Sequence, residues 1–400
     1  MDEPPIYLDN LATTRCDPEV VEGMIPYFVE HYGNAASRSH RFGADARSAT
    51  EEARARIASL IGASPKEIVF TSGATEANNL AILGVARHAR ATVGKDHVVT
   101  WSTEHPAVLD PMAALGRQGF DVTVLPVGSD GRVDLGALEH ALRPTTALVS
   151  VMAVNNEIGV TQPLDAIAAM CRSRGVLTHC DAAQATYYPI DTRTLPVDLL
   201  SLSAHKMYGP KGIGALYVRR SRPRVELEPL VYGGGHERGM RSGTLPVPSI
   251  VGMGLAAQKL ARTREEELPR VAALRDRLWS ALASELDGVE INGDPVRRAP
   301  NNLNVSFDGV EAAALLIAVR DVVALSTGSA CSSEALSPSH VLTALGGEPT
   351  VAQRSVRFGV GRFTTKAEID RVAAAVVEAV RSLRRHATLY EGGYGPTGGP

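Results

Sequence analysis

The stretch DLLSLSAHKMYGPKGIGALYVRR, residues 198–220, carries the pattern that decides the fold. Two apolar, β-rich runs flank a glycine-rich turn, and Lys206 directly follows the first run. From about residue 66 onward, similar short runs alternate with amphipathic segments, which is typical of parallel strands joined by crossover helices. The pattern predicts an α/β fold whose mostly parallel sheet is sandwiched by helices. Ligands of such sheets bind beyond the carboxyl ends of the strands, so the residues there are candidates for a site.

A smaller α+β domain is expected after this part. A long helical segment, residues 250–286, separates the two, and the last helix opens with a capping box formed by Thr365 and Glu368. The β-rich runs between these helices are residues 289–293, 303–307, 323–328 and 355–360.

We expect a large domain over residues 15–257 and a small domain made of residues 1–14 and 258–386. The final segment, residues 387–400, is rich in Gly and Pro and is expected to be a flexible tail.

The composition excludes several classes of function. Lys and Arg number 41 and Asp and Glu 44, so the net charge of −3 offers no basic field for nucleic acid or an anionic membrane. No run reaches the roughly 18 apolar residues of a membrane helix, and the acidic start is unlike a signal peptide, so we expect a soluble cytoplasmic protein. The four cysteines have no CxxC spacing, so neither a disulfide framework nor a metal site is expected.

Lys206 has the position that amine chemistry needs. A lysine at a strand end faces the crevice, and desolvation lowers its pKa, so the neutral amine can form a Schiff base with a carbonyl such as that of pyridoxal phosphate. The alternative is an ordinary solvated loop lysine, which is the commoner case.

Residues 70–79, FTSGATEANN, form a candidate phosphate site. A strand ends in a turn of small residues, and Thr75 opens a helix whose backbone N–H groups and dipole can bind one phosphate. A plain strand-to-helix turn is an equal alternative for this pattern alone.

Asp181, His105 and Gln184 also follow strand ends. An aspartate there can pair with a protonated pyridine nitrogen, a histidine can stack on the ring, and an amide can donate to it. Each has a structural alternative, such as a helix cap for the aspartate. Together with Lys206 and Thr75, however, they match what a phosphorylated pyridine aldehyde requires.

Cys331 differs from the other cysteines. It lies in STGSACSSEALSPSH, residues 326–340, a run of small polar residues without apolar periodicity that predicts a mobile, exposed loop. An accessible thiol near cationic groups has a lowered pKa and reacts as the thiolate. Cys16, Cys171 and Cys180 lie in or beside regular elements, where a small buried hydrophobic residue is the better interpretation.

These motifs resemble the cysteine desulfurases of the NifS/IscS kind, which are fold-type I pyridoxal phosphate enzymes of the class V aminotransferase family. The likeness runs from about residue 5 to 386. Its most specific blocks are YLDNLATT (7–14), FTSGATEANN (70–79), SAHKMYGPKGIG (203–214), YGGGHERGMRSGT (232–244) and STGSACSSE (326–334).

The resemblance implies roles for several residues around pyridoxal 5′-phosphate. Lys206 carries the cofactor, Asp181 pairs with the ring nitrogen, His105 stacks on the ring and Gln184 bonds the phenolic oxygen. The implied phosphate ligands are Thr75, Ser203 and His205.

The resemblance also implies a homodimer and a substrate site. Thr244 reaches the phosphate in the neighbouring subunit, which places the two sites at the dimer interface. Asn155 and Arg357 match the residues that hold the substrate carboxylate, and Cys331 matches the reactive cysteine of the family.

The implied activity is conversion of L-cysteine to L-alanine with transfer of the sulfur to Cys331 as a persulfide. His105 handles protons in this reaction. An acceptor protein, a scaffold or a sulfurtransferase, then takes the sulfur, for iron–sulfur cluster biosynthesis, tRNA thiolation, DNA modification or cofactor synthesis. The alternatives are a selenocysteine lyase, another fold-type I enzyme such as a small-amino-acid transaminase, or a catalytically silent sulfur relay. The tail does not resemble the one with which housekeeping members engage the iron–sulfur scaffold.

Overall fold

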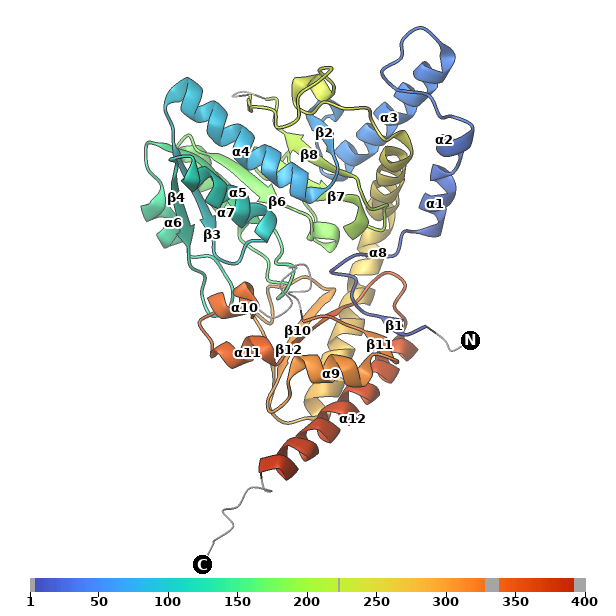
Figure 1. The fold of residues 1–400 in the computed structure, drawn as a ribbon, viewed down its shortest axis with the longest axis vertical. Coiled ribbons are helices and arrows are strands. Elements are labelled where there is room, and N and C mark those ends of the chain that lie inside the picture. The colour runs from blue at the N-terminus through green and yellow to red at the C-terminus, as the bar shows by residue number, and fades with distance from the viewer. Residues whose placement is uncertain (1–3, 222–223, 328–337, 392–400) are drawn as a thin grey trace, which may run out of the picture.

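The computed structural model describes residues 4–221, 224–327 and 338–391 (Figure 1). Its main sheet has seven strands in the order β2-β8-β7-β6-β5-β3-β4. The antiparallel strand β8 pairs with β2 and β7, and the other neighbouring strands are parallel. The prediction of a mostly parallel sheet is therefore confirmed. The strands are β2 (Ile68–Thr71), β3 (His97–Trp101), β4 (Asp121–Leu125), β5 (Thr146–Met152), β6 (Leu177–Asp181), β7 (Leu199–Ser203) and β8 (Gly214–Val218).

Helices cover both faces of this sheet. Successive strand residues point to opposite faces, so Val98 packs with α4 (Ala74–Val93) and α5 (Pro106–Arg117), while Val99 packs on the other side. Because helices cover both faces, every residue of β5 and β7 is buried. The other helices of this part are α1 (Pro18–Met24), α2 (Pro26–Val29), α3 (Arg41–Leu60), α6 (Leu135–Ala141) and α7 (Leu164–Ser173).

The small domain is built on a three-stranded antiparallel sheet, in the order β12-β10-β9, and a two-stranded parallel sheet of β1 and β11. Their bounds are β1 (Ile6–Tyr7), β9 (Val289–Ile291), β10 (Asn302–Phe307), β11 (Val323–Ala324) and β12 (Ser355–Gly359). Its helices are α9 (Ala312–Val319), α10 (His340–Ala344), α11 (Pro349–Gln353) and α12 (Lys366–Glu391). Short 3₁₀ turns lie at Pro65–Glu67, Ala185–Tyr187, Ala204–Lys206 and Glu237–Gly239.

The long helix α8 (Val247–Glu285) connects the two parts (Figure 1). Its first half, with Ile250 and Met253, packs in the core beside the seven-stranded sheet, and its second half, with Leu278 and Leu282, packs in the core of the small domain. The N-terminal Leu8 also packs in the second core. These two cores support the proposed division at about residue 257.

The capping box at the last helix is confirmed. Glu368 Oε2 accepts from the Thr365 backbone N–H at 2.7 Å, and Thr365 Oγ1 accepts from the Glu368 N–H at 3.2 Å. The helix α12 then continues to Glu391, so the expectation of a flexible segment from residue 387 is wrong for its first residues. Residues 392–400 lie outside the described part. Residues 387–391, ATLYE, contain neither Gly nor Pro, so their composition does not interrupt the helix.

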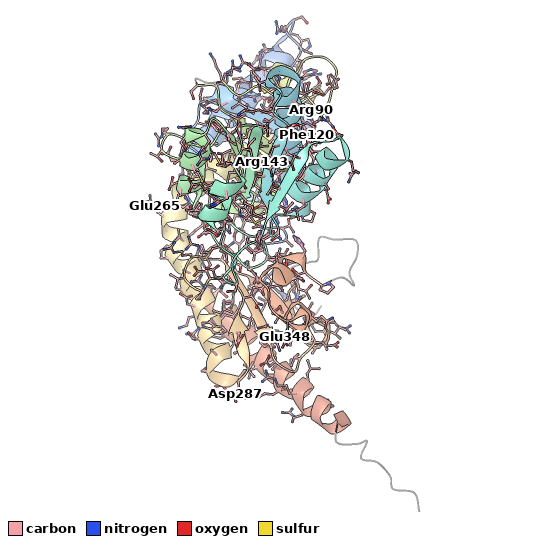
Figure 2. The ribbon with its side chains drawn as sticks, turned by 90° about the vertical axis from the view of Figure 1, so that its left-hand side faces the viewer. Arg90, Phe120, Arg143, Glu265, Asp287 and Glu348 are labelled. Atoms are coloured by element: carbon pink, nitrogen blue, oxygen red, sulfur yellow. The ribbon has the colours of Figure 1, made fainter. Side chains whose placement is uncertain are left out.

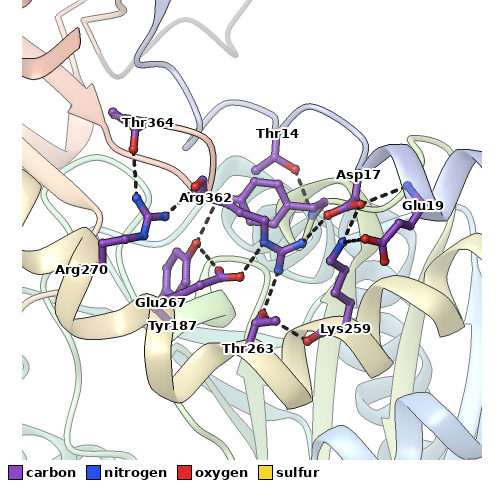
Figure 3. Close-up of polar contacts among 11 residues, drawn as sticks. Thr14, Asp17, Glu19, Tyr187, Lys259, Thr263, Glu267, Arg270, Arg362 and Thr364 are labelled. Carbon is purple, nitrogen blue, oxygen red and sulfur yellow. Dashed lines mark hydrogen bonds and ion pairs between the residues drawn. The ribbon is translucent and has the colours of Figure 1, made fainter. Parts of the chain in front are cut away.

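An ionic cluster ties the start of the large domain to the small one (Figure 3). Arg362, shortly after β12, donates to Asp17 at 2.9 Å and to Glu267 of α8 at 2.7 Å. Its guanidinium stacks over the Tyr208 ring, 4.3 Å from the centroid. Burial alone raises the pKa of Asp17, but hydrogen bonds from Lys259 and Arg362 hold it below its ordinary value. The cluster fixes the chain on both sides of the domain junction.

Near the edge strand β4, the guanidinium of Arg90 packs over the aromatic ring of Phe120. In the turned view of Figure 2, Arg90 of α4 lies beside Phe120, which precedes β4, and the guanidinium carbon is 3.9 Å from the ring centroid.

None of the helices in the described residues combines the length and apolar character needed to cross a membrane.

A ladder of three buried polar side chains, Ser150, His179 and Ser201, crosses strands β5, β6 and β7. His179 of β6 lies 2.8 Å from Ser150 Oγ of β5 through Nδ1 and 3.0 Å from Ser201 Oγ of β7 through Nε2. Burial lowers the pKa of His179 to about 4, so the ring is neutral in the folded protein at pH 7. The side chains of His179 and Asp181 lie on the same face of β6, so the ladder supports the strand end that carries Asp181.

This ladder predicts acid sensitivity. The folded pKa of His179 is about 4 and the unfolded one about 6.5, so the unfolded chain binds the proton more readily below pH 6.5. The stabilisation is complete above pH 6.5 and is lost between pH 6.5 and 4, by about 3 kcal/mol for this group. Urea unfolding at a series of pH values measures it. In the variant His179→Gln, the free energy of unfolding should fall less between pH 6.5 and 4. An identical pH dependence in both proteins would contradict the assignment of this acid sensitivity to His179.

Candidate active site

A cavity of about 660 Å³ opens at the carboxyl ends of β5, β6 and β7. The N-terminal end of α4, the segment around Leu11 and one residue of β12 complete its wall. Most of the predicted site residues come together here. Those that line the cavity are Thr75, His105, Asp181, Gln184, Ser203, His205, Lys206 and Arg357.

Lys206 follows β7 in a short 3₁₀ turn, and its amine is held by the N-terminal segment. The Nζ atom donates to the backbone carbonyls of Ala12, at 2.8 Å, and Leu11. Gln184 Nε2 donates to the same Leu11 carbonyl at 2.8 Å. The amine therefore lies inside the cavity among acceptors and does not point into bulk solvent.

Asp181 ends β6 and is almost fully buried. Its carboxylate accepts from Asn78 Nδ2 of α4 at 2.7 Å and from the Ala183 backbone N–H at 2.9 Å. These two donors fix the orientation of the carboxylate. A fixed buried carboxylate can pair with a cationic ring nitrogen. Asn78 was not among the predicted site residues.

The N-terminal end of α4 forms the anion-binding side of the cavity. The first backbone hydrogen bond within this helix runs from the Ala77 N–H to Gly73 O at 3.1 Å. The backbone N–H groups of the helical residues before Ala77 are therefore not used within the helix and can bind an anion. The turn at Gly73 packs tightly on β8, as shown by Gly214: a Cβ added there would lie only 2.6 Å from the Gly73 Cα. Thr75 lines the cavity together with Ser203 and His205.

His205 is a neutral partner on this side of the cavity. Burial, with the positive charges of Lys206 and Lys211 acting in the same direction, lowers the pKa of His205 to about 4. Its Nδ1 lies 3.1 Å from Thr13 Oγ1. At pH 7 this residue offers a hydrogen bond to an anion, while Lys211, which also lines the cavity, offers charge.

His105 caps the N-terminus of α5 and presents one defined nitrogen. The Ala107 N–H donates to His105 Nδ1 at 3.0 Å, so in the neutral ring the proton is on Nε2. Burial lowers the pKa of His105, and the positive charges of Lys206 and His340 add to this effect against the negative charge of Asp181. The ring is therefore kept neutral, with Nε2–H as its free donor toward the cavity.

Arg357 brings a fully buried guanidinium to the cavity from β12. Its Nη1 donates to Asn156 O at 2.8 Å, and its Nη2 donates to Asp9 at 3.0 Å and Ser326 Oγ at 2.9 Å. Its Nε is buried and has no hydrogen-bond partner among the described residues. An arginine held by its two terminal nitrogens, with one N–H still open, can bind a carboxylate.

The structure uses the Asn155 side chain within its own turn, and the substrate-binding role expected for Asn155 remains a prediction. Asn155 is buried, donates to Thr103 O at 2.9 Å, and accepts from the backbone N–H groups of Glu157 and Ile158. Its amide is thus used in shaping the turn. Asn156 lines the cavity instead, and its buried Oδ1 has no partner within the described chain. Two adjacent asparagines in a turn carry no signal in the sequence that tells them apart.

Two further predicted residues remain, Thr244 and Cys331. Thr244 is exposed and is not among the described residues that line the cavity. Cys331 falls in residues 328–337, which lie outside the described part of the chain. The three described cysteines, Cys16, Cys171 and Cys180, are free thiols. Burial raises the pKa of Cys171 and of Cys180, so these two thiols are unreactive.

Comparison with known proteins decides the family. The model of the class-V aminotransferases matches residues 6–372. The chain belongs to this family. It is 55% identical over 388 residues to the cysteine desulfurase IscS of Anaeromyxobacter dehalogenans (strain 2CP-C), covering 97% of this chain and 95% of that one. It is 50% identical to the cysteine desulfurase of Mus musculus, covering 97% of this chain and 84% of that one.

A solved structure described as a NifS-like protein has the same fold. It superposes with a TM-score of 0.86 at 36% sequence identity, covering 94% of this chain and all of that one. The resemblance to the NifS/IscS cysteine desulfurases is therefore confirmed.

The cofactor of these family members, pyridoxal 5′-phosphate, fits the residues of the cavity. Asp181 suits the ring nitrogen, the end of α4 suits the phosphate, and Lys206 suits the aldehyde. The buried Oδ1 atoms of Asn78 and Asn156 have no partner among the described residues, as expected beside a site that takes a polar ligand.

The two adjacent asparagines provide a matched test. Asn155→Ala removes four hydrogen bonds, one of them to the weakly accepting Met152 sulfur, and should lower the free energy of unfolding by about 3 kcal/mol, because each of the other three is worth about 1 kcal/mol. Asn156→Ala should leave stability near that of the wild type and weaken cofactor binding by about 10-fold. Thermal unfolding and titration of the apoprotein with pyridoxal phosphate measure the two effects. The reverse pattern would return the ligand-binding role to Asn155.

Proposed function

We propose that this protein is a pyridoxal phosphate-dependent cysteine desulfurase that converts L-cysteine to L-alanine and takes up the sulfur on Cys331. The observation that carries this proposal is the meeting of Lys206, Asp181 and Arg357 at one cavity. An amine, a buried carboxylate and an open guanidinium are what a cofactor aldehyde, a ring nitrogen and a substrate carboxylate require. The family relationship supports the same reaction.

The bound cofactor supplies an electron sink that acidifies the Cα–H of the amino acid. Asp181, whose carboxylate is already oriented by Asn78 and the Ala183 N–H, would pair with the protonated ring nitrogen of the cofactor. We assign the phosphate to the α4 end with Thr75, Ser203 and His205, and the phenolic oxygen to Gln184. His105 stacks on the ring.

The protein groups then act on the substrate. Arg357 binds the carboxylate and so fixes the Cα–H direction, and Lys206 Nζ removes the proton from Cα. The carbonyls of Leu11 and Ala12 fix the direction of the Lys206 amine within the cavity. His105 Nε2 is placed for a second proton transfer at the substrate sulfur or at Cβ.

The sulfur step needs no external oxidant. The Cys331 thiolate attacks the substrate Sγ, a sulfur–sulfur bond forms and the Cβ–Sγ bond breaks. The electron pair stays on Cβ, which takes up a proton and becomes the methyl group of alanine. Carbon is reduced by two electrons and the transferred sulfur is oxidised by two, so the persulfide on Cys331 balances the reaction.

We further propose that the protein acts as a homodimer with Thr244 reaching the partner's phosphate site. Thr244 is exposed on its own subunit, and exposed aromatic side chains gather near α2 and the start of α3, where the rings of Tyr32 and Phe42 stack at 5.3 Å. Phe28 is 60% and Tyr32 66% exposed, which is unusual for a monomer surface. A second copy covering this face would bury them.

We place the reaction in the cytoplasm, because a persulfide-forming cysteine needs a reducing compartment. The sulfur acceptor is a protein, a scaffold or a sulfurtransferase, and iron–sulfur cluster assembly is one of its candidate destinations.

The catalytic assignment is tested with two variants and a control. Lys206→Ala should lose the visible absorption band of the lysine-bound cofactor. Cys331→Ser should keep that band but lose more than about 100-fold of alanine and sulfide production from L-cysteine, because the sulfur has no nucleophile to receive it. Cys16→Ser, at a partly exposed cysteine, should behave as the wild type. Normal sulfide release by Cys331→Ser would exclude the persulfide step.

The proposed dimer interface is tested by placing a charged side chain among the exposed aromatic residues near α2 and the start of α3. Phe42→Glu should shift the protein toward a monomer in light scattering, since it places a carboxylate in an apolar interface. The control Val296→Glu changes an apolar residue of the small domain that is 84% exposed and should stay dimeric. A monomeric wild type, or a dimeric Phe42→Glu protein, would refute this face as the interface.

A further inference from the structure

Glu76, in the first turn of α4, braces the turn of residues 72–75 (the phosphate turn) from outside the cavity. Its Oε2 accepts from the Ser72 backbone N–H at 2.7 Å. All four residues of the phosphate turn line the cavity, whereas Glu76 is not among the described residues that do. The bond therefore fixes the start of the turn and leaves the backbone N–H groups from Gly73 onward for an anion.

Arg241 neutralises the Glu76 carboxylate. Its Nε donates to Glu76 Oε1 at 2.8 Å and its Nη2 donates to Oε2 at 3.3 Å, so the guanidinium spans both oxygens. The two side chains are mostly buried, with 21% of Arg241 and 19% of Glu76 exposed. Burial raises the pKa of Glu76, but the hydrogen bonds from Arg241 and Ser72 hold it below its ordinary value. Glu76 is thus ionised at pH 7 and is compensated by Arg241.

The segment that carries Arg241 is bonded to the outermost strand of the sheet. β2 is an edge strand, and two of its backbone groups are satisfied by side chains of this segment. The Phe70 N–H donates to Glu237 Oε2 at 2.8 Å, and Ile68 O accepts from Arg238 Nη2 at 2.6 Å. These side chains take the place of a neighbouring strand. The segment is therefore fixed to the strand that leads into the phosphate turn.

The backbone of this segment has an uncommon conformation that its side chains hold in place. Glu237 and Arg238 have φ angles of 47° and 60°, in the left-handed region that residues other than glycine rarely adopt. Glu237 is buried, and its carboxylate also accepts from Arg54 Nη1 at 2.7 Å and Nη2 at 2.8 Å. Arg241 follows three residues later, so its guanidinium meets Glu76 from a fixed direction.

We propose that Arg241 is a positioning residue for the cofactor phosphate. It cancels the charge of Glu76, so that Glu76 can hold the phosphate turn at Ser72 without repelling the anion. Without Arg241, an unpaired carboxylate in the first turn of α4 would oppose a phosphate bound at the same helix end, because like charges repel strongly where water is partly excluded. This inference rests on the proposed function in taking pyridoxal phosphate as the ligand of the cavity.

Two ligands that differ only in the phosphate group separate this role from a general loss of structure. In titrations of the apoprotein followed by the visible absorption band of the lysine-bound aldehyde, Arg241→Gln should bind pyridoxal phosphate about 10-fold more weakly than the wild type. It should bind pyridoxal, which lacks the phosphate, with wild-type affinity. The control Arg174→Gln removes an exposed ion pair with Glu139 and should bind both ligands as the wild type does. Equal losses for both ligands in Arg241→Gln, or no loss for pyridoxal phosphate, would overturn the proposal.

A double variant tests whether the charge of Glu76 is the cause. Glu76→Gln in the Arg241→Gln background removes the unpaired carboxylate but keeps a carbonyl oxygen for the Ser72 N–H. Its affinity for pyridoxal phosphate should return to within about 3-fold of the wild type. A double variant that binds as weakly as Arg241→Gln would overturn the proposal. These titrations need no turnover of cysteine, whereas a wild-type protein that never develops the absorption band would overturn the proposed function and this inference with it.

Discussion

The hydrogen bonds from the Lys206 amine to the carbonyls of Leu11 and Ala12 are the constraint on which the site depends. They join the end of β7 to a segment close to the N-terminus, nearly two hundred residues away in sequence. The same segment receives Gln184 at Leu11 O, and the Thr14 N–H and hydroxyl both donate to His205 O at 2.9 Å. Without this segment the cavity would lack one wall, and Lys206 Nζ would lose both of these carbonyl acceptors.

The N-terminal segment also brings the two domains into one site. Leu8 packs in the core of the small domain and its carbonyl accepts from the Gly359 N–H at 2.6 Å, while Asp9 pairs with Arg357. The ionic cluster around Arg362 in Figure 3 holds the same junction from the other side. A guanidinium from the small domain is therefore placed a fixed distance from an amine of the large one, which is what binding an amino acid between them requires.

The strand ends could be predicted from the sequence, because the alternation of β-rich and helical runs fixes which edge of a parallel sheet carries the site. This reasoning predicted Lys206 and Asp181 correctly as neighbours of one cavity. It did not distinguish Asn155 from Asn156, since both lie in one turn and only the three-dimensional path of that turn separates them. Asn78 was missed because its contact with Asp181 joins residues 103 apart. The role of the N-terminal segment was missed for the same reason.

The central claim is that Lys206, and no other amine in the cavity, takes the cofactor aldehyde. Lys211 also lines the cavity and provides a genuine competitor. Reduction of the holoprotein with borohydride fixes the cofactor to the nitrogen that holds it, and mass spectrometry of the peptides then identifies the residue. The structure predicts the pyridoxyl group on Lys206. Its recovery on Lys211, or on any other lysine, would contradict the account.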